Sequence, residues 1–190
     1  MRRVMFVDLE TSGLDPRVNQ ILEFACMPVI DGQVLYHQQS HFYINHSQIT
    51  YSFKNLQNFK NRVTDRTAGV IALSAAKAES AIKIAFDAFK DSCHGIILGG
   101  KNVGIFDAQF LQKFLTPETF TVLCKHRCVD VAAMYARKMD EAPPSLSQCL
   151  VRAKEMGITG PYIDKQFVSH TALDDAAQCA ELYAGWWNKQ

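Results

Sequence analysis

A short apolar run that ends in two acids, near the start of the chain, most constrains what this sequence can fold into. Val4–Val7 are apolar, and Asp8, Leu9 and Glu10 follow before a Thr-Ser-Gly break. Because successive strand side chains point to opposite faces, Asp8 and Glu10 are expected on the same face. Two carboxylates held together repel each other unless a cation lies between them, and Mg²⁺ and Mn²⁺ are hard ions that prefer oxygen ligands. The pattern predicts a strand that ends in a candidate metal site; two solvated acids at a strand end are the plainer interpretation.

Length and composition favour one globular domain over residues 1–190. The chain is 48% hydrophobic and 21% charged, which is ordinary for a soluble protein. Its apolar runs are too short to span a bilayer or to form a signal-peptide core, so we expect no membrane association and a cytoplasmic location. The net charge of +1 argues against a protein that grips long duplexes through bulk charge. A polyanionic partner would have to be short, or held by local charge and metal ions.

The six cysteines do not frame loops, and reduced thiols are therefore expected. Cys124, His126 and Cys128 could form part of a zinc site, but no fourth ligand stands at a recognisable spacing. We do not expect zinc to be held there.

Hydrophobic periodicity predicts strands first and then helices alternating with strands. Asp31-Gly32 is a hairpin signal, Ser145 and Gln148 form a capping box, and Pro117 is expected to break a helix. Expected strands cover residues 3–9, 21–30, 33–44, 96–98 and 127–129. Expected helices cover residues 77–93, 106–115, 130–139, 145–156 and 171–187. This order predicts an α/β fold, in which a mixed sheet of about five strands, the first three antiparallel, has helices on both faces.

Residues 45–72 are the least regular stretch, and in them four cations stand among three aromatic residues. These residues are Lys54, Lys60, Arg62 and Arg66 with Tyr51, Phe53 and Phe59. Cations could contact phosphates and aromatic rings could stack on bases, which would make the stretch a substrate arm. A solvated helical excursion explains the same residues equally well.

Asp107 stands where a glycine-rich loop meets the start of a helix. Asn102 and Gly104, just before it, would let the backbone approach a ligand closely. The helix dipole also favours an acid at this position, so stability alone could explain Asp107. Asp130 similarly precedes an expected helix, where an N-cap is the simpler role and support of the site is the alternative.

Two neighbouring acids near the C-terminus have different expected roles. Thr171 and Asp174 have the spacing of a helix cap. Asp175 faces about a hundred degrees further round the helix, so it is not needed for the cap and could join Asp8. His170, just before the helix, could lie near the same ion, although a surface or capping role is commoner for such a residue.

Taken together, these segments resemble the DEDDh branch of the DEDD 3′→5′ exonuclease superfamily. That branch includes oligoribonuclease, ribonuclease T and the proofreading subunit of bacterial DNA polymerase III. The three motifs read here FVDLETSGL, GKNVGIFDAQFL and HTALDDA, the last with H-x(4)-D spacing. The tyrosine branch would have Tyr where this chain has Thr171. The second motif departs from many relatives, because Lys101-Asn102 replaces His-Asn and one more residue precedes Phe106.

The resemblance implies a ribonuclease H-like fold and stepwise 3′→5′ hydrolysis of single-stranded nucleic acid to nucleoside 5′-monophosphates. Four carboxylates would hold two divalent cations, Mg²⁺ or Mn²⁺: Asp8, Glu10, Asp107 and Asp175. His170 would be the catalytic general base. The substrate-binding residues would be Thr11, Leu14, Asn102 and Phe106. Leu14 would pack against the terminal base, with ordinary packing as the alternative.

The resemblance leaves the substrate and the partners open. Short single-stranded DNA or RNA is the expected partner, and a homodimer is consistent with several relatives. One alternative is a proofreading or accessory exonuclease that acts on DNA primer ends with a polymerase. Others are a ribonuclease H-like endonuclease, or a module that binds nucleic acid without hydrolysis. A block at the 3′ end should stop an exonuclease and leave internal cutting intact.

Overall fold

The computed structural model describes residues 2–49, 71–90, 95–165 and 171–190. His170 and almost all of the proposed substrate arm within residues 45–72 therefore lie outside the described residues. The strands are β1 (Arg3–Thr11), β2 (Ile21–Ile30), β3 (Gln33–Val34), β4 (Ser40–Asn45), β5 (Ala72–Ser74), β6 (Ile96–Gly100) and β7 (Cys124–Asp130). The helices are η1 (Tyr36–Gln38), α2 (Ala75–Phe89), α3 (Asp107–Phe114), α4 (Pro117–Leu123), α5 (Val131–Met134), α6 (Leu146–Glu155) and α7 (Ala172–Trp187).

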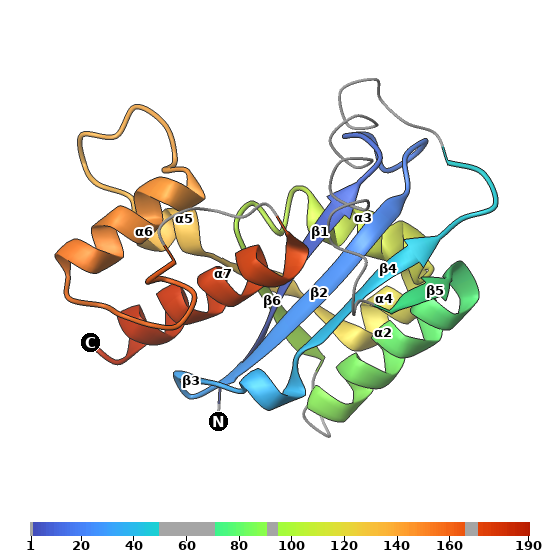
Figure 1. Cartoon of the computed structure of the whole chain (residues 1–190), viewed down its shortest axis with the longest axis horizontal. Coiled ribbons are helices and arrows are strands. Elements are labelled where there is room, and N and C mark those ends of the chain that lie inside the picture. Colours follow the sequence, from blue (N-terminus) through green and yellow to red (C-terminus); the bar gives the residue numbers. More distant parts are fainter. Residues whose placement is uncertain (1, 50–70, 91–94, 166–170) are drawn as a thin grey trace.

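One mixed sheet forms the centre of the fold, as predicted (Figure 1). Its strand order is β5-β4-β2-β1-β6-β7, and β3 pairs with β2. β1, β3 and β4 are antiparallel to β2, whereas β6 is parallel to β1 and β7 is parallel to β6. The carboxyl ends of β1, β6 and β7 therefore lie at the same end of the sheet. The loops that follow these three strands can meet there.

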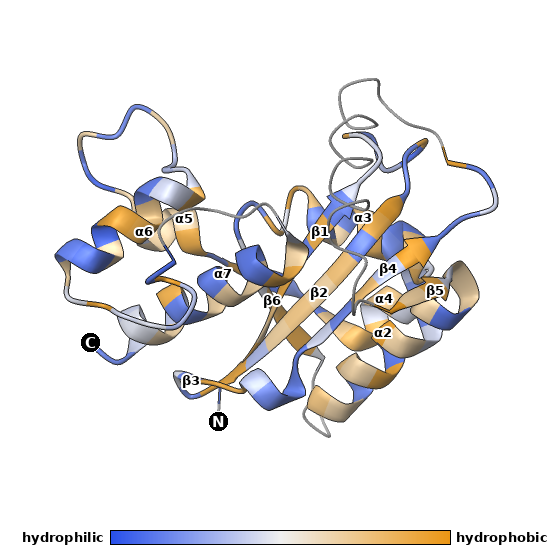
Figure 2. Cartoon of the chain, in the orientation of Figure 1, coloured by the Kyte–Doolittle hydropathy of each residue, from blue (hydrophilic) through white to orange (hydrophobic). Residues whose placement is uncertain are grey.

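Helices cover both faces of the sheet because side chains of β1 alternate between two apolar cores. Met5 and Val7 pack with residues of α2, α3 and α4, whereas Val4 and Phe6 pack with residues of α6 and α7. Both faces of the central strands are therefore buried, and β2 is apolar along most of its length (Figure 2). This is the pattern expected where helices cover a sheet on both sides. None of the described helices is long and apolar enough to cross a membrane.

The described sheet has seven strands where about five were expected. The predicted strand 33–44 is divided into β3, η1 and β4. Tyr36, in η1, donates its hydroxyl hydrogen to Glu181 Oε1 of α7 at 2.8 Å, and this distant contact draws the segment out of the sheet. β5 was not predicted because its residues, Ala-Leu-Ser, have weak strand propensity. Pairing with β4 forms this strand.

Two helix predictions were wrong in length or number. The helix expected over 130–139 is the single turn α5, because Arg152 binds the Asp140 carboxylate through two hydrogen bonds of 2.6 and 2.7 Å and holds the following segment as a loop. Pro117 separates two helices, but it also begins α4, which was missed. Proline is well suited to the first helical position, since its missing N–H would have no partner there. The capping box of Ser145 and Gln148 is confirmed.

Candidate active site

Asp8 and Glu10 lie at the end of β1, on the face of the sheet that α7 covers. They continue the alternation of Phe6, which packs in the same core as α7. In the β1–β2 register, Asp8 lies opposite Ala25 and Glu10 lies opposite Glu23. The apolar face of the central strands therefore changes to an acidic face at this end of the sheet.

Three alanines bring the first turn of α7 onto the sheet beside this acidic face. Ala25 of β2 packs with Ala172 and Ala176 of α7 in a small buried cluster. Small side chains let a helix and a strand approach closely, because little volume separates the two backbones. Asp175 belongs to this first turn and is thereby brought toward Asp8.

The neighbouring Asp174 faces elsewhere, as the predicted cap required. The Thr171 hydroxyl oxygen accepts a hydrogen bond from the Asp174 backbone N–H at 3.2 Å. The Asp174 carboxylate accepts a hydrogen bond from Lys165 Nζ at 2.6 Å. Asp174 thus has a structural role that Asp175 does not share.

Asp107 is the first residue of α3 and is almost completely buried. Its Oδ1 accepts a hydrogen bond from the Leu9 backbone N–H at 3.1 Å, which fixes α3 to β1 between Asp8 and Glu10. Burial raises the pKa of Asp107 to about 7, and the charge of Glu10 adds to this effect. An acid that served only to cap the helix would not need such an environment.

The pKa of Asp8 shows how the predicted acids are arranged. It lies well above the usual value, first because of burial and then because of the charges of Asp107, Asp175, Glu10 and Glu23. Carboxylates from β1, β2, α3 and α7 therefore lie close enough to disfavour ionisation of Asp8. Like charges assembled in this way destabilise the fold unless protons or cations offset them.

No group of three or more His, Cys, Asp or Glu side chains in the described part of the chain already has the arrangement of a metal site. This also applies to Cys124 and Cys128, of which the first is buried and the second exposed. The chemistry of the acidic cluster nevertheless fits hard divalent cations, because all four predicted ligands supply carboxylate oxygens.

Glu23 is a buried acid of the site that the sequence reasoning missed. Its Oε1 accepts a hydrogen bond from the Ala172 backbone N–H at 3.2 Å, and it bonds His41 Nε2 at 2.8 Å. The first N–H groups of a helix have no partner within the helix, so Glu23 holds the start of α7 against β2. The available signal was a single acid within the otherwise apolar Ile21–Ile30. Because Glu23 and Ala25 are two residues apart on a strand, they lie on the same face of the sheet.

Asp130 supports the loop that leads to Asp107. Its Oδ1 accepts a hydrogen bond from the Ala132 N–H at 2.9 Å, which confirms the predicted N-cap. Its Oδ2 accepts a second hydrogen bond from the Asn102 N–H at 3.0 Å. Asn102 has a φ of 58°, a left-handed conformation that asparagine tolerates better than most residues. Asp130 therefore also holds this turn in place.

The residues predicted to bind substrate differ in exposure. Leu14 is 79% exposed and is available to a ligand. Thr11 is buried, and its hydroxyl donates to the Gly13 carbonyl oxygen at 2.7 Å, so its side chain tightens the turn before Leu14. Phe106 packs against the Phe110 ring at 5.1 Å between centroids.

The mixed sheet, with acids gathered at the end of its central strand, defines an α/β protein with a ribonuclease H-like exonuclease fold. The sequence profile of the RNase_T exonuclease family matches residues 5–183, and the chain belongs to that family. No curated protein matches the chain in sequence.

Solved structures of exonuclease I share this fold. Exonuclease I from Methylocaldum szegediense is 15% identical with a TM-score of 0.67, covering 100% of this chain and 41% of that one. The zinc-bound complex of E. coli exonuclease I with single-stranded DNA is 16% identical with a TM-score of 0.66, covering 100% of this chain and 41% of that one. E. coli exonuclease I with a dA16 oligonucleotide is 14% identical with a TM-score of 0.66, covering 97% of this chain and 40% of that one. The chain thus spans about two fifths of the length of these proteins.

Proposed function

We propose that the protein is a 3′→5′ exonuclease of the DEDDh type that removes nucleoside 5′-monophosphates from single-stranded nucleic acid. The observation that carries this proposal is that hydrogen bonds hold α3 and α7 against the sheet and bring their acids to the end of β1. The pKa of Asp8 is raised accordingly, first by burial and then by the charges of these acids. The family match supports the hydrolytic class. The single-stranded DNA in the exonuclease I complexes supports the substrate class.

The acidic cluster would hold two divalent cations, Mg²⁺ or Mn²⁺, through four carboxylates: Asp8, Glu10, Asp107 and Asp175. Such ions, when bound, would activate a water molecule and stabilise the charge that develops on the departing oxygen. The protein's own contribution is positional. The Asp107–Leu9 hydrogen bond holds α3 against β1, and the Glu23–Ala172 hydrogen bond holds the start of α7 against β2. The helices that carry Asp107 and Asp175 are therefore fixed relative to the sheet.

His170 is the proposed general base for the attacking water. It directly precedes Thr171, the N-cap of α7, and imidazole is the side-chain group most often used as a general base near neutral pH. General-base catalysis contributes about 10²–10⁴-fold to a rate. His170→Ala should therefore lose that much activity and keep the Mn²⁺-induced rise in melting temperature. An unchanged pH–rate profile would exclude His170 as the base.

Leu14, exposed in the turn after β1, is the proposed contact for the terminal base, with the backbone after Glu10 near the terminal sugar. The turn that carries Leu14 is held by Thr11. Asn102 and Phe106 would contribute from the loop before Asp107.

The decisive experiment is digestion of 5′-labelled oligonucleotides with Mg²⁺ or Mn²⁺ and separation of products by length. An exonuclease gives a ladder that shortens one nucleotide at a time, and a 3′-phosphate blocks it. Internal fragments from the blocked substrate would instead indicate an endonuclease, and binding without products would indicate a non-catalytic module. Parallel ribo- and deoxyribo-oligonucleotides would establish which sugar is preferred.

A further inference from the structure

Three adjoining cavities follow one side of the molecule, from the turn after β1 to the start of β7. The first, of about 530 Å³, is lined by Arg17 and by Lys113 of α3. The second, of about 730 Å³, shares Gln112 with the first and continues to β7. The third, of about 310 Å³, shares Gly95 and Lys125 with the second. Because neighbouring cavities share lining residues, the three adjoin one another, and we treat them together as one depression.

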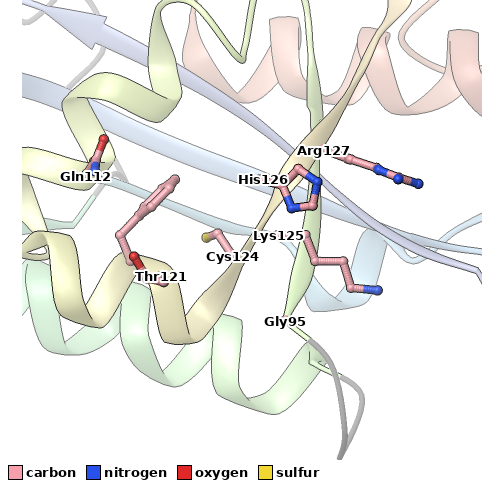
Figure 3. A pocket seen from close by; sticks show the side chains of 8 residues that line it. Gly95, Gln112, Thr121, Cys124, Lys125, His126 and Arg127 are labelled. Carbon is pink, nitrogen blue, oxygen red and sulfur yellow. The ribbon is translucent and has the colours of Figure 1, made fainter.

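Positive charge dominates this depression. Lys125, His126 and Arg127 line the second cavity, and Figure 3 shows them following one another along β7, with Gln112 and Thr121 across the cavity. The third cavity is lined by Arg2, Arg3, Lys90 and Lys125. Among the described residues that line these three cavities there is no Asp or Glu. Asp87 and Glu118 line a neighbouring cavity, which shares Lys90 with the third. We call this depression the basic track.

The charges of the basic track are not equally available. Arg17 pairs with Asp15 at 2.8 Å, and Lys90 pairs with Asp87 at 2.6 Å. No ion pair found within the described residues involves Lys125, His126 or Arg127. In a chain of net charge +1, this is a local concentration of positive potential, which attracts anions.

The backbone of β7 makes a peptide strand a poor occupant of the track. β7 is an edge strand, and an even edge can accept an added strand through its free N–H and C=O groups. Here, however, Ile96 of β6 pairs with Cys124, and Leu98 pairs with Cys128. Two residues of β6 thus span four of β7, and the resulting bulge interrupts the ladder. The segment presents side-chain cations in place of a regular backbone edge.

Helix α3 connects the acidic cluster to the track. α3 begins at Asp107 and carries Gln112 in the wall of the track. β1, β6 and β7 are parallel, so Lys125 lies toward the end of the sheet opposite Asp8. Four strand residues separate these levels by roughly 13 Å along the strands, about the rise of four stacked nucleotides.

We propose that the basic track binds the phosphates of the nucleic-acid strand on the 5′ side of the bond that is cut. This inference rests on the proposed exonuclease function and adds to it a second contact region, which only a strand longer than a few nucleotides can reach. An acidic peptide is the competing occupant, and the test below includes it.

The test compares Lys125→Ala/Arg127→Ala with Lys154→Ala/Lys189→Ala, a control that removes two exposed charges outside the track. Binding of labelled dT20 and dT3 is measured in an Asp8→Asn background, to prevent hydrolysis, across a range of KCl concentrations. The track variant should bind dT20 about tenfold more weakly than the control. Its slope of log K against log salt should be smaller by about 1.4, because each phosphate contact on a single strand contributes about 0.7. Affinity for dT3 should match the control.

Equal dT20 affinity and equal salt slope in the two double variants, with equal melting temperatures, would overturn the proposal. So would tight binding of a ten-residue oligoglutamate that the track variant loses while its affinity for dT20 is unchanged. Hydrolysis of dT3 by the unmodified protein tests the exonuclease function separately, because dT3 is too short to reach the track. Failure of one proposal can therefore be distinguished from failure of the other.

Discussion

The acidic cluster around Asp8 and the basic track along β7 differ in burial as much as in sign. Asp107 and Glu23 of the cluster are buried. Burial and neighbouring carboxylates raise the pKa of Asp8 and of Asp107, which costs folding free energy. His126 and Arg127 of the track are exposed, where solvent screens their repulsion. A fold keeps a costly arrangement only where something offsets it, so the cluster indicates chemistry, while the track indicates binding that grows with the length of a polyanion.

The largest expected effect tests whether activity depends on the direction in which an acid in the first turn of α7 points, as well as on its charge. Asp175→Asn should lower the rate of mononucleotide release by about 10³-fold or more, equivalent to about 4 kcal/mol of transition-state stabilisation. Asp174→Asn, one residue earlier and paired with Lys165, should change it by less than about threefold. Initial rates on dT20 at saturating Mn²⁺ would measure both. Equal losses would remove the distinction between the two acids and with it the proposed site.

A smaller effect tests whether the cluster costs stability when no cation offsets it. The pKa of Asp107 is about 7 in the fold against an ordinary value near 3.8, so between these pH values the folded state holds more protons than the unfolded one. Stability in the presence of a chelator should therefore fall as pH rises from about 4 to about 7, by an amount on the order of 4 kcal/mol. Thermal unfolding at several pH values would measure this.

Glu181, whose pKa burial also raises, should add to this fall in stability, whereas acids with a lowered pKa should not obscure it. The pKa of Asp140 is lowered to about 2, mainly by its hydrogen bond to Arg152, so its stabilising contribution is lost only below about pH 4.

Adding Mn²⁺ at pH 7.5 should raise the melting temperature, because the ions bind the folded site and not the dispersed chain. Asp8→Asn should reduce both the pH dependence and the response to Mn²⁺. A melting temperature that does not respond to saturating metal would count against the site.

The smallest effect separates an acid that positions the cluster from one that only stabilises the fold. Glu23→Ala should cost about 1–3 kcal/mol, because the Ala172 N–H loses its acceptor, and should also lower kcat by about tenfold as the start of α7 shifts. Glu23→Gln keeps an acceptor oxygen and should recover part of kcat. Urea unfolding and steady-state kinetics on each variant would measure the two effects.

Glu181→Gln is the matched control for Glu23. Glu181 is also a buried acid, and it belongs to α7 itself. It accepts hydrogen bonds from Tyr36 and from the Tyr162 and Ile163 N–H groups, away from the first turn of the helix. Its replacement should lower stability and leave kcat within about twofold. If both variants lose kcat in proportion to stability, Glu23 has no positioning role.

Local patterns were sufficient for several features of the fold. Alternation in β1 placed Asp8 and Glu10 on one face. The Asp31-Gly32 turn has φ values of 46° and 76°, as a two-residue hairpin turn requires. The start of α7 at Ala172 follows the predicted cap. Each of these depends on residues close together in the chain, where sequence pattern and geometry are directly related.

Contacts across the chain decided the rest. The Leu9–Asp107 hydrogen bond joins residues 98 apart, and the Glu23–Ala172 bond joins residues 149 apart. Tyr36 and Glu181, which interrupt a predicted strand, are 145 apart. The sequence by itself therefore determined the periodicity of the strands and helices, the caps and the residue types of the acidic cluster. Only the tertiary structure decided that Glu23 belongs beside them and that Lys125 adjoins Arg2, Arg3 and Lys90, because burial and charge proximity arise when distant segments pack together.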